Sequence, residues 1–255
     1  MTDTLVAFLD ILGCDAIALH GTAHEQNNIV AFLKRINQTY LSKQGTIIRD
    51  LGIGQQIIHN PEVFTCSDSI LLSVEVSDSA DFSRAQTIDN FMSTMVSIFW
   101  QGLQAGLLIR GGITRGECIH EGSLIFGEAY ARAVRLEKQT MYPRIAFDDG
   151  VFDSALPPVM SDERKALCTK EVAGHLFLNC LAWHQGVWRD YFYFKYGESD
   201  WPEGQIQETE IRQAIEDIQS ITASQLSALT GDPLEKWAWF NNQWNQEKAC
   251  WPIFD

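Results

Sequence analysis

The chain has 255 residues, of which 45% are hydrophobic, enough to bury a sizeable core in one domain with an appendage or in two small domains. Its formal net charge of -14 argues against a nucleic-acid polymer or an anionic membrane surface as the main partner, because both are bound through clustered Lys and Arg. Six scattered cysteines without metal-ligand spacing, and no long apolar run, predict a cytoplasmic protein with reduced thiols that is neither secreted nor inserted in a membrane.

The first part of the chain alternates strand and helix signals. An apolar run at residues 5–13 is typical of a buried strand, and Thr22-Ala23-His24-Glu25 has the form of a capping box that starts an amphipathic helix. Residues 46–51 and a segment ending at residues 70–76 have the composition of strands. We expect these two strands to form a hairpin, with Asp68 at the head of the second.

The middle of the chain continues this alternation. A helix signal opens at Ser83 and ends at the glycines after residue 101. Further segments follow, with strands predicted at 107–114, 117–120, 144–147, 175–180 and 191–195 and a helix at 129–139. The order strand, helix, strand, strand, helix, strand is that of a ferredoxin-like βαββαβ core. The sequence therefore predicts an α+β fold with helices on one face of a mostly antiparallel sheet.

The composition changes near residue 200. Trp201-Pro202-Glu203-Gly204 indicates a linker between a domain at residues 1–200 and a helical extension at residues 205–255. The second helix of this extension starts at Asp232-Pro233 and carries the aromatic residues Trp237, Trp239, Phe240 and Trp244. We expect the extension to pack on the core or on a dimer.

Two aspartates stand inside otherwise apolar, strand-like runs. Asp10 lies within Leu5–Gly13, and Asp68 lies within Phe64–Leu72. A carboxylate in a low-dielectric environment costs several kcal/mol unless a cation or hydrogen-bond donors meet it. Each aspartate alone fits a strand end that faces water, but two that meet at neighbouring strand ends form a site for divalent cations.

Common nucleotide-binding and catalytic motifs are missing from the sequence. Gly52-Ile53-Gly54-Gln55-Gln56-Ile57 lacks the third glycine of a dinucleotide fingerprint, and no GxxxxGK[ST] loop occurs. The six histidines show no HExxH or triad-like spacing.

Four segments do occur in an informative order. They are Phe8-Leu9-Asp10-Ile11-Leu12-Gly13, Ser67-Asp68-Ser69, Arg110-Gly111-Gly112-Ile113-Thr114-Arg115-Gly116-Glu117 and the stretch from Ile125 to Glu137. On this strand and helix pattern, their order resembles the catalytic domain of the class III nucleotidyl cyclases. That domain opens with FxDIxG on its first strand, has a second Asp in the following hairpin and carries a helix of the form GxxxNxxxRxE. The resemblance covers about residues 1–196.

The resemblance implies roles for individual residues. Asp10 and Asp68 match the two metal carboxylates of a site that holds two Mn2+ or Mg2+ ions, and the carbonyl of Ile11 matches a further ligand. Arg135 matches the catalytic arginine that stabilises the transition state, and Lys195 stands where the family has a triphosphate-binding lysine.

The sequence also departs from the family pattern. The asparagine that orients the ribose falls on Ala131, so Arg132 or Tyr130 is a candidate to replace its contact. Arg110 and Arg115 are candidates either for contacts with the triphosphate or for strand-end charges that face water.

The two base-selecting positions of adenylate cyclases, a Lys and an Asp, fall on Phe64 and Leu124. Neither side chain can hydrogen-bond a purine edge. In this respect the chain resembles the pyrimidine cyclases of the bacterial Pycsar antiphage systems, which make cyclic UMP or cyclic CMP that activates a separate effector.

The expectation is therefore a homodimeric pyrimidine nucleotidyl cyclase that uses UTP or CTP. In the family one subunit supplies the metal carboxylates and the other supplies the arginine and the base contacts, which implies two composite sites. Three alternatives stay open: a degenerate domain that binds a nucleotide without turnover, a cyclase for ATP or GTP, and an adaptor protein that acts through its aromatic C-terminal helix. Ala131 favours the first, whereas the joint presence of Asp10, Asp68 and Arg135 opposes it.

Overall fold

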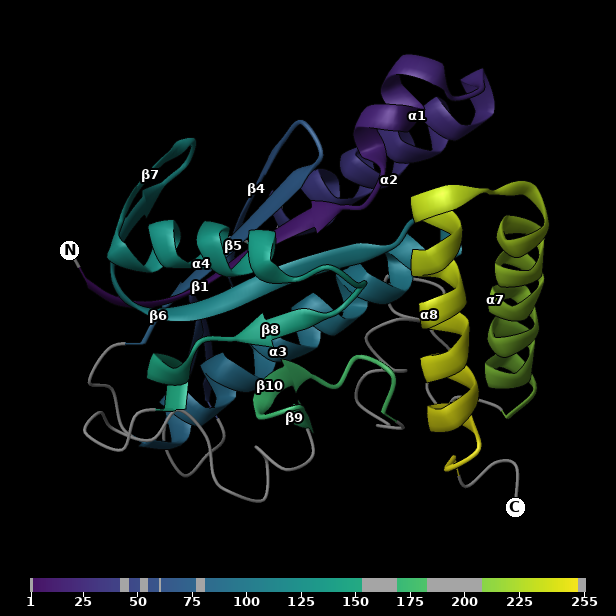
Figure 1. The fold of residues 1–255 in the computed structure, drawn as a ribbon. Coiled ribbons are helices and arrows are strands. Elements are labelled where there is room, and N and C mark those ends of the chain that lie inside the picture. Colours follow the sequence, from purple (N-terminus) through teal and green to yellow (C-terminus); the bar gives the residue numbers. More distant parts are fainter. Residues whose placement is uncertain are drawn as a thin grey trace.

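The structure is a computed structural model, which describes residues 2–41, 46–50, 55–59, 61–76, 81–152, 169–182 and 208–251. Within these residues eight strands form one sheet in the order β4-β5-β1-β6-β8-β10-β9, with β7 paired to β6 (Figure 1). The strands are β1 (Thr2–Ile11), β4 (Glu62–Cys66), β5 (Ser69–Glu75), β6 (Ile109–Glu121), β7 (Leu124–Gly127), β8 (Ile145–Phe147), β9 (Thr169–Val172) and β10 (His175–Leu178). Strands β6 and β8 are parallel, and the other pairs are antiparallel.

The central part of this sheet has the predicted ferredoxin-like topology. The elements β1, α2 (Ala23–Leu41), β4, β5, α3 (Asp81–Gln104) and β6 occur in this chain order, with the separate pair β2 (Thr46–Asp50) and β3 (Gln55–His59) between α2 and β4. Their strands lie in the order β4-β5-β1-β6. The α+β prediction is therefore confirmed. A short helix, α1 (Cys14–His20), precedes α2, and the single turn η1 (Asp149–Phe152) follows β8.

The two faces of the sheet are covered differently. Alternate residues of β1, among them Leu5 and Leu9, join the main core under α2 and α3. The residues between them, such as Val6 and Phe8, face α4 (Glu128–Gln139) in a smaller apolar cluster. The sequence predicted helices on one face only, whereas α4 lies on the face opposite α3 (Figure 1).

Helix α4 approaches β6 closely because of a glycine. A Cβ atom on Gly112 would lie 2.8 Å from the carbonyl oxygen of Ala133 and 2.8 Å from the Cβ of Leu136, distances that real side chains do not show. The missing side chain therefore lets the helix backbone rest on the strand and brings the end of α4 over β6.

The capping box predicted at the start of α2 is present. The backbone N–H of Thr22 donates to the Glu25 carboxylate at 2.7 Å, and the backbone N–H of Glu25 donates to the Thr22 hydroxyl at 3.3 Å. Burial of Ile29, Phe32 and Ile36 then holds α2 against the sheet.

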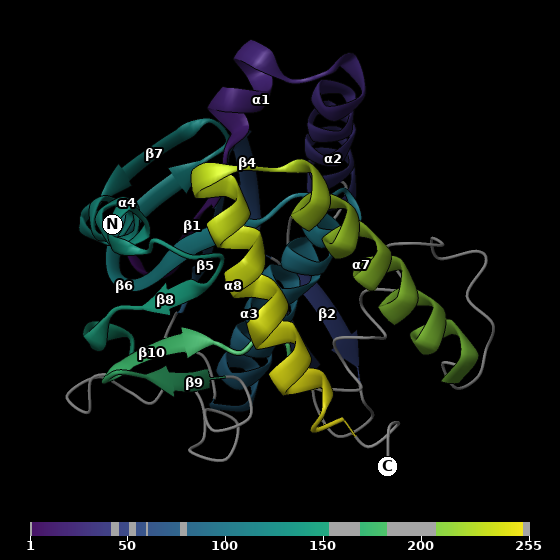
Figure 2. The ribbon, with the colours of Figure 1, turned by 45° about the vertical axis from the view of Figure 1, so that its right-hand side comes forward.

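The C-terminal helices α7 (Glu208–Ala228) and α8 (Gly231–Lys248) stand beside the end of α3 (Figure 2). Trp244 of α8 is fully buried and meets Trp100 of α3 edge-on, with 5.5 Å between ring centroids. The indole N–H of Trp251 donates to the carbonyl of Leu181 at 3.1 Å. The extension thus packs on the main core, while the predicted division near residue 200 and the linker 201–204 lie outside the described residues.

Two strand predictions are wrong in their pairing. Strand β2 (Thr46–Asp50) pairs with β3 (Gln55–His59) in a separate two-stranded sheet, and β5 pairs with β4 instead. The strands predicted at 107–114 and 117–120 are also wrong in their division, because one strand, β6, begins at Ile109 and runs unbroken to Glu121. The predicted strand at 191–195 lies outside the described residues.

Candidate metal and nucleotide site

The sheet brings Asp10 and Asp68 to the same end of β1. Asp68 lies in the tight turn between β4 and β5, where Ser67 has a positive φ of 57°. The backbone N–H of Ile11 donates to the Asp68 carbonyl at 3.1 Å, and Asp10 is paired in register with Ser69. The sequence predicted Asp68 at the head of a strand, whereas the structure has it in the turn immediately before β5, beside the end of β1.

The pKa of Asp10 reflects this environment. Burial raises the pKa of its carboxyl, the guanidinium of Arg110 lowers it, and the nearby charge of Asp68 raises it again. The same charges act on Cys14, whose thiol pKa is raised to about 11, mainly by burial and then by Asp68, Asp15 and Asp10. This corner of the molecule is therefore strongly anionic and favours positively charged ligands.

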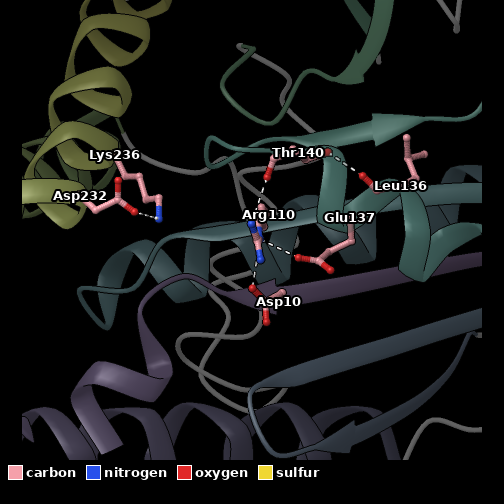
Figure 3. Close-up of polar contacts among 7 residues, drawn as sticks. All are labelled: Asp10, Arg110, Leu136, Glu137, Thr140, Asp232 and Lys236. Carbon is pink, nitrogen blue, oxygen red and sulfur yellow. Dashed lines mark hydrogen bonds and ion pairs between the residues drawn. The ribbon is translucent and has the colours of Figure 1, made fainter. Parts of the chain in front are cut away.

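One arginine neutralises part of this charge. Arg110 is the register partner of Asp10 across β1 and β6, and its Nε donates to Asp10 Oδ2 at 3.1 Å (Figure 3). The same Nε lies 2.6 Å from Oε1 of Glu137, and an Nη donates to the carbonyl of Thr140 at 3.3 Å. Arg110 therefore lies between two carboxylates, one from the sheet and one from α4.

Glu137 was not singled out in the sequence. Its side chain is only 4% exposed, and burial raises the pKa of its carboxyl, an effect that Arg110 opposes. A sequence pattern could have identified Glu137, because Ala129, Ala133 and Glu137 recur at four-residue spacing on the buried face of α4. A carboxylate at the third position of such a stripe requires a cation beneath it, and Arg110 provides one.

The donor set suits a hard divalent cation. Carboxylate oxygens and a backbone carbonyl are the ligands that Mg2+ and Mn2+ prefer. Among the described residues, Asp10 and Asp68 do not form part of a group of three or more acidic, His or Cys side chains arranged to hold a metal. The proposed divalent-cation site therefore consists of the two carboxylates of Asp10 and Asp68, with the Ile11 carbonyl as the predicted further ligand.

Arg135 does not lie at the acidic site of its own chain. It lies two residues before Glu137 on α4, about 200° around the helix, so it projects away from the sheet. Its side chain is exposed and forms no ion pair within the part of the chain that the structure describes. Ala131, one turn before Arg135 on the same helix, is also exposed.

The other two predicted arginines are engaged in ion pairs. Arg115 is buried and binds both carboxylate oxygens of Asp3, with Nη2 to Oδ2 at 2.6 Å. It lies five residues from Arg110 on the unbroken strand β6, so it faces the opposite side of the sheet about 17 Å away. Arg132 binds Asp148 through Nε at 2.7 Å and also contacts Glu128.

The predicted base-selecting residues differ in exposure. Phe64 of β4 is half-buried against the small cluster that contains Val6 and Leu71, on the same face of the sheet as Asp10. Leu124 of β7 is 59% exposed. Tyr130 meets Phe8 edge-on, with 6.2 Å between ring centroids. Lys195 lies outside the described residues, so its predicted role stays a prediction.

No helix within the described ranges is both long and apolar enough to cross a membrane. No family model matches the chain, and no curated protein matches it.

Several solved structures similar to this one are nucleotidyl cyclase domains. The monomeric guanylyl cyclase domain of the RhoGC fusion protein from the aquatic fungus Blastocladiella emersonii is 12% identical over 69% of this chain and 93% of that chain, with a TM-score of 0.45. The guanylate cyclase domain of RhGC from Catenaria anguillulae, in complex with GTP, is 15% identical over 58% of this chain and 79% of that chain, with a TM-score of 0.39. A class III adenylyl cyclase-like ATP-binding protein from Pseudomonas aeruginosa is 12% identical over 95% of this chain and 44% of that chain, with a TM-score of 0.36.

Proposed function

We propose that this protein is a nucleotidyl cyclase that converts UTP or CTP to cyclic UMP or cyclic CMP and pyrophosphate. The observation that carries the proposal is the meeting of Asp10 and Asp68 at one end of β1, in an anionic corner with oxygen ligands. Two Mn2+ or Mg2+ ions bound there would lower the pKa of the ribose 3′-hydroxyl and hold the triphosphate, so that pyrophosphate leaves as the ring closes.

Arg110 has a positioning role in this scheme. Its hydrogen bond to Asp10 and its ion pair with Glu137 fix the orientation of the Asp10 carboxylate before any ligand binds. Its side chain is 25% exposed, so part of the guanidinium is accessible to a triphosphate. A cation held at this point also reduces the repulsion between a highly charged substrate and the acidic corner.

The position of Arg135 supports a homodimer with composite sites. The side chain points away from Asp10 of its own chain and has no acidic partner among the described residues. In a symmetric dimer, Arg135 from one subunit can face the carboxylates of the other. There it offsets the charge that develops on the α-phosphate oxygens, a contribution that is largest in the transition state.

The pyrimidine preference follows from the side chains at two positions. Phe64 offers a ring face and Leu124 an apolar surface, and neither has a group that hydrogen-bonds a purine edge. The proposed biological role, synthesis of a second messenger that activates a separate effector in antiphage defence, rests on the resemblance of the sequence to the Pycsar cyclases. A cyclase for ATP or GTP uses the same acidic pair and differs only in this pocket.

The test is to incubate the purified protein with each of the four ribonucleoside triphosphates and Mn2+, and to identify any cyclic product by mass. We expect cyclic UMP or cyclic CMP from the wild type and no product from Asp68→Asn. If ATP or GTP has a kcat/KM equal to or above both pyrimidine values, the pyrimidine proposal is wrong and a purine cyclase remains. If no triphosphate yields a product but nucleotides bind, the degenerate nucleotide-binding alternative is favoured.

A further inference from the structure

A pocket lies between α8 and the outer strands β9 and β10, apart from the acidic corner. Figure 2 shows the ribbon of α8 beside these two strands. It is a shallow pocket of about 50 Å³ that is partly open to solvent. Its walls include the rings of Phe177 and Trp239, and its polar groups include Arg144, Lys170, Gln243 and Glu247. The proposed cyclase reaction uses none of these residues.

Arg144 is the unusual group in this pocket. The guanidinium carbon lies 4.0 Å from the centre of the Phe177 ring and 5.8 Å from that of Trp239, so aromatic surfaces flank the cation. Its Nε is buried and has no hydrogen-bond acceptor among the residues that the structure describes. Burial also lowers the pKa of this arginine, because few polar groups stabilise its charge.

The acid nearest to this pocket does not neutralise Arg144. Glu247 forms an ion pair with Lys170 across the space between α8 and β9. Within the described ranges, Arg144 forms no ion pair and no side-chain hydrogen bond. Since buried or half-buried charges in proteins are normally paired, a cation left alone among aromatic rings indicates a binding site for an anion.

We propose that this pocket binds a small organic carboxylate with an apolar, preferably aromatic, body. The planar guanidinium matches a carboxylate through two parallel hydrogen bonds at its edge, because its flat faces are already flanked by rings. One unpaired cation balances one negative charge. The apolar walls suit a ring or branched chain, whereas a free phosphate would leave those walls unused.

The pocket is separate from the acidic corner but shares a segment with it. The carbonyl of Arg144 accepts a hydrogen bond from the N–H of Gly111 at 3.0 Å, and the carbonyl of Thr140 binds Arg110. Because the pocket residues take no part in the proposed cyclase reaction, ligand binding can be tested without any assumption about catalysis. A failed cyclase assay leaves this proposal unaffected.

The experiment is a fluorine NMR titration of the full chain with 4-fluorobenzoate and with its neutral analogue 4-fluorobenzamide. Ligand concentrations reach about 10 mM, above the roughly millimolar Kd typical of a ligand with about ten heavy atoms. We expect wild-type protein to bind the benzoate at least about tenfold more tightly than the benzamide, because a charged hydrogen-bonded pair contributes that much. This comparison requires no variant.

Variants then locate the site. Arg144→Gln should abolish the preference for the benzoate, and Gln243→Trp should block both ligands by filling the pocket while leaving Arg144 in place. Arg212→Gln, which removes an exposed arginine on α7, should change neither Kd. The proposal is overturned if neither ligand binds, if both bind equally, if Arg144→Gln or Gln243→Trp binds as the wild type does, or if inorganic phosphate displaces the benzoate at a lower concentration than benzoate itself.

Discussion

Replacing Arg110 by Met removes the one cation that lies between Asp10 and Glu137. Asp10 and Glu137 have side chains that are 17% and 4% exposed, and their oxygens lie 3.1 and 2.6 Å from Arg110 Nε. The variant leaves two nearby carboxylates without the Arg110 charge in a poorly solvated space, where Lys138 still acts on Glu137. We expect the folded protein to remain but to lose stability in a manner that depends strongly on pH.

The magnitude follows from this geometry. Removing one partner from a buried ion pair typically costs about 3–5 kcal/mol, and the 25% exposure of Arg110 favours the lower end, about 3 kcal/mol. For a chain of this length, each kcal/mol corresponds to roughly 2–4 °C, so Tm should fall by about 6–12 °C near neutral pH. Replacing Glu137 by Gln in the same variant should restore part of this loss.

The pH dependence gives the sharper test. Burial raises the pKa of both carboxyls above their values in the unfolded chain, so the folded state binds protons more tightly and stability falls as pH rises through the folded pKa. Without Arg110 both pKa values rise further. Thermal unfolding followed by circular dichroism should therefore show a larger difference from wild type at about pH 8 than at about pH 5. A constant difference, or one that grows in acid, would refute the reasoning.

Three further predictions concern the proposed active site and the core. Asp10→Ala should abolish cyclic nucleotide formation when the product is assayed by mass, while leaving a folded chain. Retained activity would contradict the assignment of Asp10 as a metal ligand. Mixing inactive Asp68→Ala with inactive Arg135→Ala should restore about a quarter of wild-type activity after random subunit exchange, since half of the dimers then have one intact composite site; no recovery despite demonstrated exchange would exclude shared sites. Trp244→Ala should lower stability by about 3–5 kcal/mol in a denaturant titration, and Trp244→Phe by much less, because the buried indole N–H has no acceptor within the described ranges; equal losses would contradict this packing.

Local patterns in the sequence predicted the elements of the fold well. The capping box at Thr22 and the apolar stripes of α2 and α3 depend on neighbouring residues, so they can be recognised without knowledge of the rest of the chain. Strand pairing depends on residues distant in sequence. For that reason the partner of residues 46–51 was predicted wrongly, and Asp68 was expected at the head of a strand rather than in the β4–β5 turn.

In the candidate site too, local sequence patterns were predictable, whereas contacts between residues distant in sequence were not. Asp10 and Asp68 could be chosen from sequence because a charged residue within an apolar run requires an explanation. The pairing of Arg110 with Asp10 and Glu137 could not, because it depends on the register between β1 and β6 and on the close approach of α4 at Gly112. Register also separates Arg115 from Arg110, since an odd spacing on one strand places the two on opposite faces.

The most direct test of the central claim is a titration of the protein with Mn2+ followed by the electron paramagnetic resonance signal of the free ion. If Asp10 and Asp68 form one cation site, Asp10→Asn and Asp68→Asn should each weaken Mn2+ binding by at least about tenfold. Asp15→Asn, which removes an exposed carboxylate in the same anionic corner, is the matched control and should bind Mn2+ nearly as the wild type does. Equal Mn2+ affinity in the wild type, Asp10→Asn and Asp68→Asn would contradict the proposal that these two aspartates hold the metal.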